Sequence, residues 1–100
     1  MEIKKVKNAE VLELALAGRL DTTTAPQLEA ELNSSIEDVT ELVLNFQELE
    51  YISSSGLRAL LMLAKTANAM HKGVTLSKVT PMVKKVITVS HFDAFFKMTE

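Results

Sequence analysis

The stretch that decides the fold is Tyr51-Ile52-Ser53-Ser54-Ser55-Gly56-Leu57, which joins two segments of different periodicity. Before it, residues 40–46 form a nearly continuous apolar run, which predicts a parallel strand buried on both faces. After it, apolar residues recur at helical spacing, which predicts a helix over residues 54–72 that Gly73 ends. The serines therefore lie at a predicted helix N-terminus, where free N–H groups favour a serine cap or a phosphate attached to a serine.

The residues that precede this junction predict two strands and a helix. Residues 3–7 have the pattern of a short edge strand, and residues 11–17 that of a central strand that ends at Gly18. Thr24 and Gln27 fit a capping box at the start of the first helix. The apolar residues of that helix are spaced four apart and predict one buried stripe, formed by Leu28, Leu32 and Ile36.

The residues that follow the junction predict a fourth strand over residues 74–79 and a third helix that begins at Thr80 and Pro81. Residues 91–96 carry three aromatic side chains, which we expect to close the core with a last short strand or turn. The inward residues of the third helix are expected to be Val83, Val86 and Ile87. The pattern predicts one α/β domain over residues 1–100, a mixed sheet of about four to five strands with about three to four helices packed on it.

Composition limits the chemistry that the chain can carry. It has 100 residues, a formal net charge of −2, no cysteine and two histidines. The dispersed lysines argue against a nucleic-acid partner, and no glycine-rich phosphate loop or nucleophile elbow is present. We therefore expect no catalytic residue, no metal and no cofactor. The N-terminus lacks a signal-peptide pattern and no segment reaches the about 20 apolar residues of a membrane span, so a cytoplasmic protein is expected.

Three segments, residues 18–26, 42–46 and 52–57, together resemble the STAS domain family, specifically the bacterial anti-sigma-factor antagonists. The family's usual forms are Gly-x-Leu-Asp before the first helix, a strand that ends in Leu-Asp, and Asp-Ser-Ser-Gly-Leu at the start of the second helix. Each string is short, but their order and spacing match over essentially the whole chain. The resemblance implies a STAS-type fold and a binding module controlled by phosphorylation rather than an enzyme.

The resemblance also implies the partners. The unphosphorylated form binds an anti-sigma factor or a related serine kinase and so frees that factor's target, a form of transcription regulation by partner switching. The partner uses ATP to phosphorylate a serine, which ends the interaction, and a metal-dependent serine phosphatase reverses the change. The acceptor maps onto Ser55, with Ser54 as the second choice. Ser53 and Asn45 stand where the family has aspartate, and both changes remove negative charge near the expected site.

Projection of the second helix at about 100° per residue separates its faces. The core face consists of Leu57, Leu60, Leu61, Ala64 and Ala67. A cationic stripe, toward which Ser54 points, consists of Arg58, Lys65 and Lys72. Ser55 projects beside a third side that is apolar without facing the core, formed by Ala59, Met62 and Thr66, with Leu63 and Met70 further round. Because exposed methionine and small residues suit docking, the expected partner-binding residues are Asp21, Thr22, Ser53, Ser54, Ser55, Gly56, Arg58, Ala59 and Met62.

Other interpretations of the same residues stay open. The serines could act only as a helix cap, which needs a single serine, and Asp21 fits a turn as well as a partner contact. The chain could also be a STAS adaptor in a transporter-associated or signalling complex that works without phosphorylation. A small phosphotransfer enzyme or carrier would instead need a histidine or aspartate acceptor at the end of a strand.

Overall fold

The computed structural model describes residues 1–92, 94 and 96–99. Five strands form one sheet in the order β1-β2-β3-β4-β5, in which β1 is antiparallel to β2 and the other neighbours are parallel. The sheet confirms the predicted mixed α/β class. The strands are β1 (Glu2–Asn8), β2 (Val11–Leu20), β3 (Glu41–Ile52), β4 (Gly73–Ser77) and β5 (Lys97–Met98). The helices are α1 (Ala25–Ser35), η1 (Ile36–Asp38, a 3₁₀ turn), α2 (Ser54–Ala69) and α3 (Pro81–Val89).

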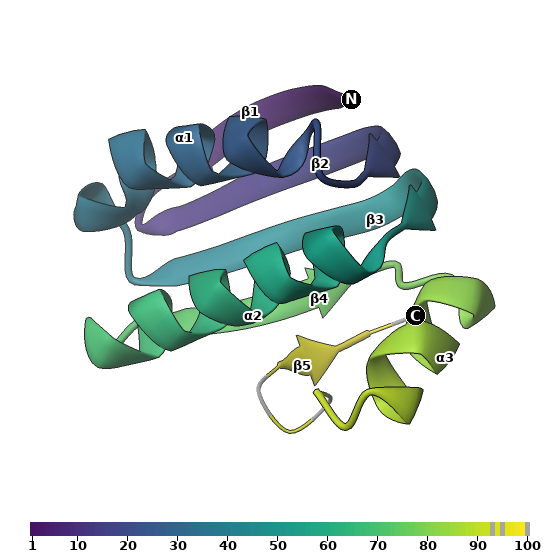
Figure 1. Ribbon diagram of the computed structural model, residues 1–100. Helices are drawn as coiled ribbons and strands as arrows, with labels where there is room; N and C mark the ends of the chain where they lie inside the picture. Colours follow the sequence, from purple (N-terminus) through teal and green to yellow (C-terminus); the bar gives the residue numbers. More distant parts are fainter. Residues whose placement is uncertain (93, 95, 100) are drawn as a thin grey trace.

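The α-helices α1 and α2 lie side by side on one face of the sheet, and none of the described residues forms a helix on the other face (Figure 1). This arrangement follows from the strand order, because β2, β3 and β4 succeed one another in a single direction. Right-handed crossovers that always step in the same direction place their helices on the same face. None of the helices in the described part of the chain has the length and hydrophobicity of a membrane span.

The prediction that β3 is buried on both faces was wrong. Along its first half, Leu42, Leu44 and Phe46 are buried under the helices, whereas Val43 and Asn45 are only partly covered. The apolar run predicts two-sided burial because parallel strands are usually covered on both faces. Here the crossovers leave the second face open, and Ala15 of β2 is partly exposed beside Asn45.

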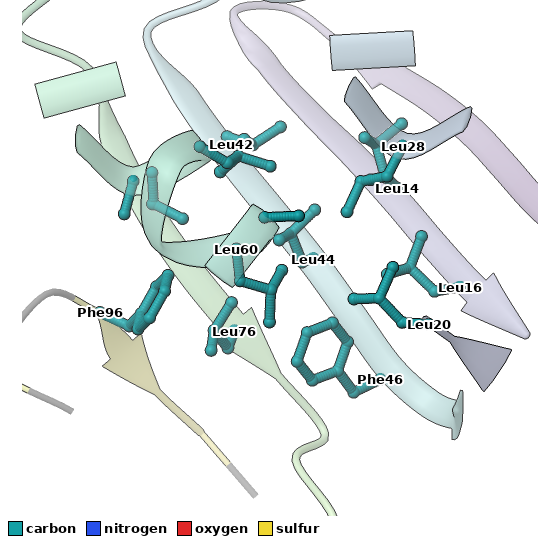
Figure 2. Packing of buried hydrophobic residues seen from close by; sticks show 14 of the residues in the cluster. Leu14, Leu16, Leu20, Leu28, Leu42, Leu44, Phe46, Leu60, Leu76 and Phe96 are labelled. Atoms are coloured by element: carbon teal, nitrogen blue, oxygen red, sulfur yellow. The ribbon is translucent and has the colours of Figure 1, made fainter. Parts of the chain in front are cut away.

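The core lies between the helix-covered face of the sheet and α1 and α2. Figure 2 shows leucines of β2 and β3 meeting Leu28 of α1 and Leu60 of α2, with Phe46 beside them. The predicted stripe of α1 is buried throughout. Phe96 is also buried in the core, as expected for the C-terminal segment. Asp93 and Phe95 of the same segment lie outside the described residues.

Several element ends differ from the predicted ones. β2 passes through Gly18, which has a φ of +102° at a shift in register, and continues to Leu20. β3 likewise continues to Ile52. α2 stops at Ala69 because His71 adopts a positive φ, and the Lys72 amide then donates to the Ala67 carbonyl, so Gly73 opens β4 instead of ending the helix.

The third helix begins as predicted. The Thr80 hydroxyl accepts a hydrogen bond from the Val83 amide at 3.4 Å, and Pro81 occupies the first helical turn. Val83 and Ile87 are fully buried and Val86 is partly buried. Cap, proline and apolar spacing are local signals, which is why the sequence predicts this helix well.

Candidate functional site

The candidate site forms where β2 and β3 end and α2 begins. Ser53 caps α2, and its hydroxyl accepts a hydrogen bond from the Gly56 amide at 3.1 Å. The Ser53 amide donates to the Leu20 carbonyl at 2.9 Å, which attaches the cap to the end of β2. One serine of the three therefore has a structural role, and that serine is Ser53.

Gly56 allows the first turn of α2 to lie directly against β2. The residue is buried, and a Cβ atom added there would collide with the Leu20 carbonyl oxygen. That oxygen cannot readily withdraw, because it already accepts the hydrogen bond from the Ser53 amide. Any larger residue at this position would push the start of α2, with its serines, away from the sheet.

Ser54 and Ser55 occupy the first turn of α2 and are exposed. Within the described part of the chain, neither hydroxyl makes a hydrogen bond. The amides of this turn belong to the group that has no acceptor inside a helix, so they present partial positive charge beside both hydroxyls. Two serine hydroxyls are therefore accessible at a helix end that favours an anion.

Asp21 organises the turn that follows β2. Its Oδ1 accepts hydrogen bonds from the Thr23 amide at 3.0 Å and the Thr24 amide at 3.1 Å. The hydrogen bond from the Thr24 amide is the largest of the effects that hold the pKa of the Asp21 carboxyl below its ordinary value, and the Thr23 amide and the Arg19 charge act in the same direction. Asp21 is thus an ionised structural acceptor at the edge of the site.

The predicted capping box at the start of α1 was wrong. The Thr24 hydroxyl makes no cap hydrogen bond, because it donates back to the Arg19 carbonyl at 2.8 Å and accepts from the Asp21 amide at 2.9 Å. The Gln27 side chain donates to the Met1 carbonyl at 3.1 Å instead of reaching the cap. The polar residues before α1 therefore stabilise the turn rather than the helix end.

The ends of β2 and β3 bring the turn and the serines together. Leu20 pairs with Ile52 in the sheet, and the two strands continue from this pair into Asp21 and Ser53. Figure 1 shows the ends of β2 and β3 at the same side of the sheet. Thr22 is exposed on the turn, and Arg58 is exposed one turn into α2. Residues from two segments about 30 positions apart in the sequence thus meet at one edge of the sheet, as parallel strands require.

The expected docking side of α2 is only partly available. Ala59 is 6% exposed and Leu63 is 4% exposed, whereas Met62 is 55% exposed. Ala59 lines a groove between α1 and α2 together with Glu29, Leu32, Asn33, Met62, Leu63 and Thr66. The prediction that Ala59 lies on an exposed surface was therefore wrong, because α1 covers it, and Met62 remains at the exposed rim.

The structure corrects two further predictions, which concern the positions of Asn45 and Lys72. Asn45 lies within β3 on the open face of the sheet, where its Oδ1 accepts from the Gln47 amide at 2.9 Å, so it is not at the end of the strand beside the serines. Lys72 is partly buried and its ammonium donates to the Glu37 carbonyl at 3.3 Å and to the Val39 carbonyl. The cationic stripe of α2 is thereby reduced to Arg58 and Lys65.

Sequence reasoning missed an aromatic and cationic pair at this edge. The guanidinium of Arg19 lies over the ring of Tyr51, with Cζ 4.2 Å from the ring centroid. Arg19 Nε also lies 3.8 Å from Asp21 Oδ2. Arg19 in β2 and Tyr51 in β3 are register partners. Only the register reveals the pair, because the residues are far apart in the sequence and β3 was predicted to end before Tyr51.

Among residues 1–92, 94 and 96–99, no three histidine, aspartate or glutamate side chains gather as metal ligands. The site so far described consists of a capped helix start, two accessible serine hydroxyls, one ionised carboxylate and the exposed arginines Arg19 and Arg58. It holds no arrangement of nucleophile and base among these residues. Accessible hydroxyls beside the free amides of a helix N-terminus form a site at which a negatively charged group would be stabilised.

Comparisons with known proteins identify the relatives of the chain. A family model described as the STAS domain matches residues 2–100. A Bordetella bronchiseptica protein named as an anti-sigma factor antagonist, BtrV, is 33% identical over 97 residues, which cover 96% of this chain and 84% of that protein. The relationship spans nearly the whole length of both chains.

Two solved structures have the same fold. A Thermotoga maritima protein named as an anti-sigma factor antagonist matches with a TM-score of 0.90 at 15% identity, over 98% of this chain and 86% of that chain. The Bacillus cell fate determinant SpoIIAA in its phosphorylated form matches with a TM-score of 0.78 at 22% identity, over 99% of this chain and 92% of that chain. At these identities the likeness concerns the fold.

Proposed function

This chain belongs to the STAS domain family, and we propose that it is an anti-sigma-factor antagonist that binds a serine kinase of the anti-sigma type until Ser55 is phosphorylated. The relative at 33% identity carries the name of such an antagonist. The observation that supports the switch is that the three serine hydroxyls differ in exposure and hydrogen bonding. Ser53 accepts a hydrogen bond in the cap, whereas Ser54 and Ser55 are exposed and neither hydroxyl has a hydrogen bond within the described residues. Between these two, the resemblance to the family favours Ser55, because it directly precedes Gly56.

In the proposed reaction, the partner's ATP transfers its γ-phosphoryl group to Ser55 Oγ. The bond between the γ-phosphorus and the bridging oxygen breaks, ADP leaves, and the hydroxyl proton is released. A phosphoserine carries about −1.5 to −2 charge. At the start of α2 the helix dipole offsets this charge by about 0.3 to 1 kcal/mol, so the fold should persist. Against a docked partner surface the same dianion is expected to cost more than 1.4 kcal/mol, which is about tenfold in affinity.

The replacement of the family's aspartate by Ser53 does not remove the geometry that the proposal needs. Ser53 provides the oxygen that a capping aspartate would provide, and it holds the Gly56 amide at 3.1 Å. What the chain lacks is the negative charge. We therefore propose a kinase that recognises the shape of this edge more than an acidic residue directly before the serine pair.

The switch can be tested with serine variants. We expect Ser55→Asp to weaken binding to the captured kinase at least about tenfold with an unchanged fold, and Ser55→Ala to bind but accept no phosphate. Ser54→Ala is the matched control, because it removes the neighbouring exposed hydroxyl and should still be phosphorylated. The measurements are pull-down from native extract, circular dichroism, and mass spectrometry after incubation with kinase and ATP.

Phosphate found only on a residue other than Ser55 would contradict the assignment of the acceptor. Equal recovery of a transport component by wild type and Ser55→Asp would instead support a constitutive STAS adaptor, the second interpretation that the missing acidic residue at Ser53 favours. An acid-labile phosphate would indicate a histidine or aspartate carrier.

A further inference from the structure

We propose that Arg19, held over the ring of Tyr51, is a specificity-determining residue that binds a carboxylate of the partner protein. The inference rests on the proposed function, since it assigns one contact of the same interface. It adds a second contact to the proposed interface, at the same edge of the sheet as Ser55 but on the face that α1 and α2 do not cover. Arg19 occupies the unspecified position of the Gly-x-Leu-Asp string, so the motif itself assigns it no role.

The guanidinium is oriented but its hydrogen-bonding capacity is unused. Tyr51 lies beneath it at 4.2 Å and Asp21 Oδ2 lies 3.8 Å from Nε, a separation too long for a hydrogen bond. Across the described ranges 1–92, 94 and 96–99, the Arg19 side chain donates no hydrogen bond, although it carries five N–H donors. The side chain is also 63% exposed. Its donors are therefore directed to solvent and open to a ligand.

Tyr51 and Asp21 reduce the entropy that Arg19 would lose on binding. A free arginine side chain loses up to about 2 kcal/mol of rotamer entropy when it is immobilised. Here the ring and the carboxylate already restrict it, and Asp21 is itself fixed by the amides of Thr23 and Thr24. A preorganised fork of donors matches the two oxygens of a carboxylate, which is the reason to expect an acidic side chain rather than an amide or hydroxyl.

The pair lies next to the strand ends that lead into the serine run. Arg19 and Tyr51 are register partners, and the next pair along the strands is Leu20 and Ile52, which leads directly into Ser53. Because Leu20 and Ile52 are buried under the helices, the side chains of Arg19 and Tyr51 leave the sheet on its open face. A partner that reaches from Ser55 across Asp21 to Arg19 would wrap around the edge of the sheet.

Asp21 is paired with Arg19 through charge, but the pair leaves the N–H donors of the guanidinium free. Glu50 precedes Tyr51 and is exposed, but it makes no ion pair with Arg19 in the described residues. Asp21 is the single carboxylate within 4 Å of the guanidinium there, and it is already shared with two backbone amides. The exposed N–H donors of Arg19 are thus available to an acidic group on the partner, even though its charge is shared with Asp21.

The test uses the full chain and the serine kinase that wild-type protein captures, with dissociation constants measured at low and high salt. Arg19→Ala should weaken binding about tenfold to hundredfold, since hydrogen bonds to a charged group are lost. Arg19→Lys, which keeps the charge without the fork, should fall between wild type and Arg19→Ala. The salt dependence of binding should be smaller for Arg19→Ala than for wild type, a change that a purely structural role would not produce.

Tyrosine variants test the orientation of the guanidinium. Tyr51→Phe keeps the ring and should bind like wild type, whereas Tyr51→Leu removes it and should weaken binding about two- to fivefold. Lys5→Ala is the matched control, because Lys5 forms an exposed ion pair of the same length, 3.8 Å, with Glu31 on α1. This control should bind the kinase like wild type, and all variants should keep the wild-type circular dichroism.

The outcomes separate this inference from the proposed function. If Ser55→Asp weakens binding while Arg19→Ala binds like wild type at both salt concentrations, the role of Arg19 is overturned and the proposed function stands. If Lys5→Ala weakens binding as much as Arg19→Ala, the effect is one of general charge and the specific contact is likewise overturned. Failure of wild-type protein to capture any kinase would overturn both.

Discussion

At the scale of single residues, the site depends on how closely α2 approaches the end of β2. Gly56 permits that approach because it has no Cβ atom, and Ser53 secures it with one hydrogen bond through its hydroxyl and another through its amide. The neighbouring hydroxyls of Ser54 and Ser55 gain their exposure from this arrangement. Gly56 and Ser53 thus fix the backbone at the start of α2, and the hydroxyls of Ser54 and Ser55 stay accessible.

Gly56→Ala should destabilise the protein, although alanine is favoured over glycine in helices by about 1 kcal/mol. The added Cβ atom would meet a backbone oxygen that is fixed by the Ser53 amide, and overpacking of this kind costs about 1 to 3 kcal/mol. We expect a net loss in the free energy of unfolding, measured by urea denaturation. Ser54→Ala in the same turn should change it by less than about 0.5 kcal/mol, and an equal effect of both variants would contradict the packing argument.

Ser53→Ala should remove the cap of α2 and lower the free energy of unfolding by about 1 kcal/mol. Ser53→Asp should retain it, because a carboxylate can accept from the Gly56 amide and interacts favourably with the helix dipole. Urea denaturation of the two variants beside wild type measures the difference. A Ser53→Asp variant as unstable as Ser53→Ala would show that the hydroxyl, rather than any acceptor, is required.

At the scale of elements, the turn between β2 and α1 is a unit held by side chains. Asp21 accepts from two amides, and the Thr24 hydroxyl closes the turn onto the Arg19 carbonyl at 2.8 Å. These bonds replace the helix cap that the sequence predicts at the same residues. Because Arg19 contacts both Asp21 and Tyr51, the turn is also linked to β3.

The stability of this turn should depend on pH in one direction. Because the folded-state pKa of Asp21 is lowered from its ordinary value of 3.8, the folded protein holds this proton less tightly than the unfolded chain. The stabilisation is therefore fully present above that value and is lost as pH falls through the lower folded-state pKa. In urea denaturation, the difference in the free energy of unfolding between wild type and Asp21→Asn should shrink as pH falls below 3.8. A difference that stays constant with pH would contradict a stabilising role of the ionised Asp21 carboxylate.

At the scale of the whole molecule, the sheet has one covered and one open face. The unidirectional order of β2, β3 and β4 places α1 and α2 together, and the open face is left with partly exposed residues such as Val43 and Ala15. The same arrangement lets the carboxyl edge of the sheet be approached from both sides, with Ser55 toward the helices and Arg19 toward the open face.

Neighbouring positions of β3 should therefore respond unequally to truncation. Leu44 is fully buried, so Leu44→Ala should lower the free energy of unfolding by about 2 to 5 kcal/mol. Val43 is partly exposed on the open face, so Val43→Ala should cost less than about 1.5 kcal/mol. Equal losses in urea denaturation would indicate that something covers the open face.

The sequence by itself determined the order and type of the elements. The buried stripe of α1, the cap and proline of α3, and the helix that starts at the serine run follow from signals within a few residues, such as apolar spacing, capping hydroxyls and proline. The family and the serine motif were recognised on the same local basis. The predicted boundaries were less accurate at two places. β2 continues through the bulge at Gly18, and α2 ends early because His71 adopts a positive φ.

Only the tertiary structure decided which faces and side chains are available. The burial of Ala59 depends on α1 lying beside α2, and the position of Asn45 depends on β3 continuing to Ile52. The Arg19–Tyr51 pair exists only because parallel pairing aligns the ends of two strands. Register and crossover handedness are set by contacts between distant segments, so no local pattern of residues could specify them.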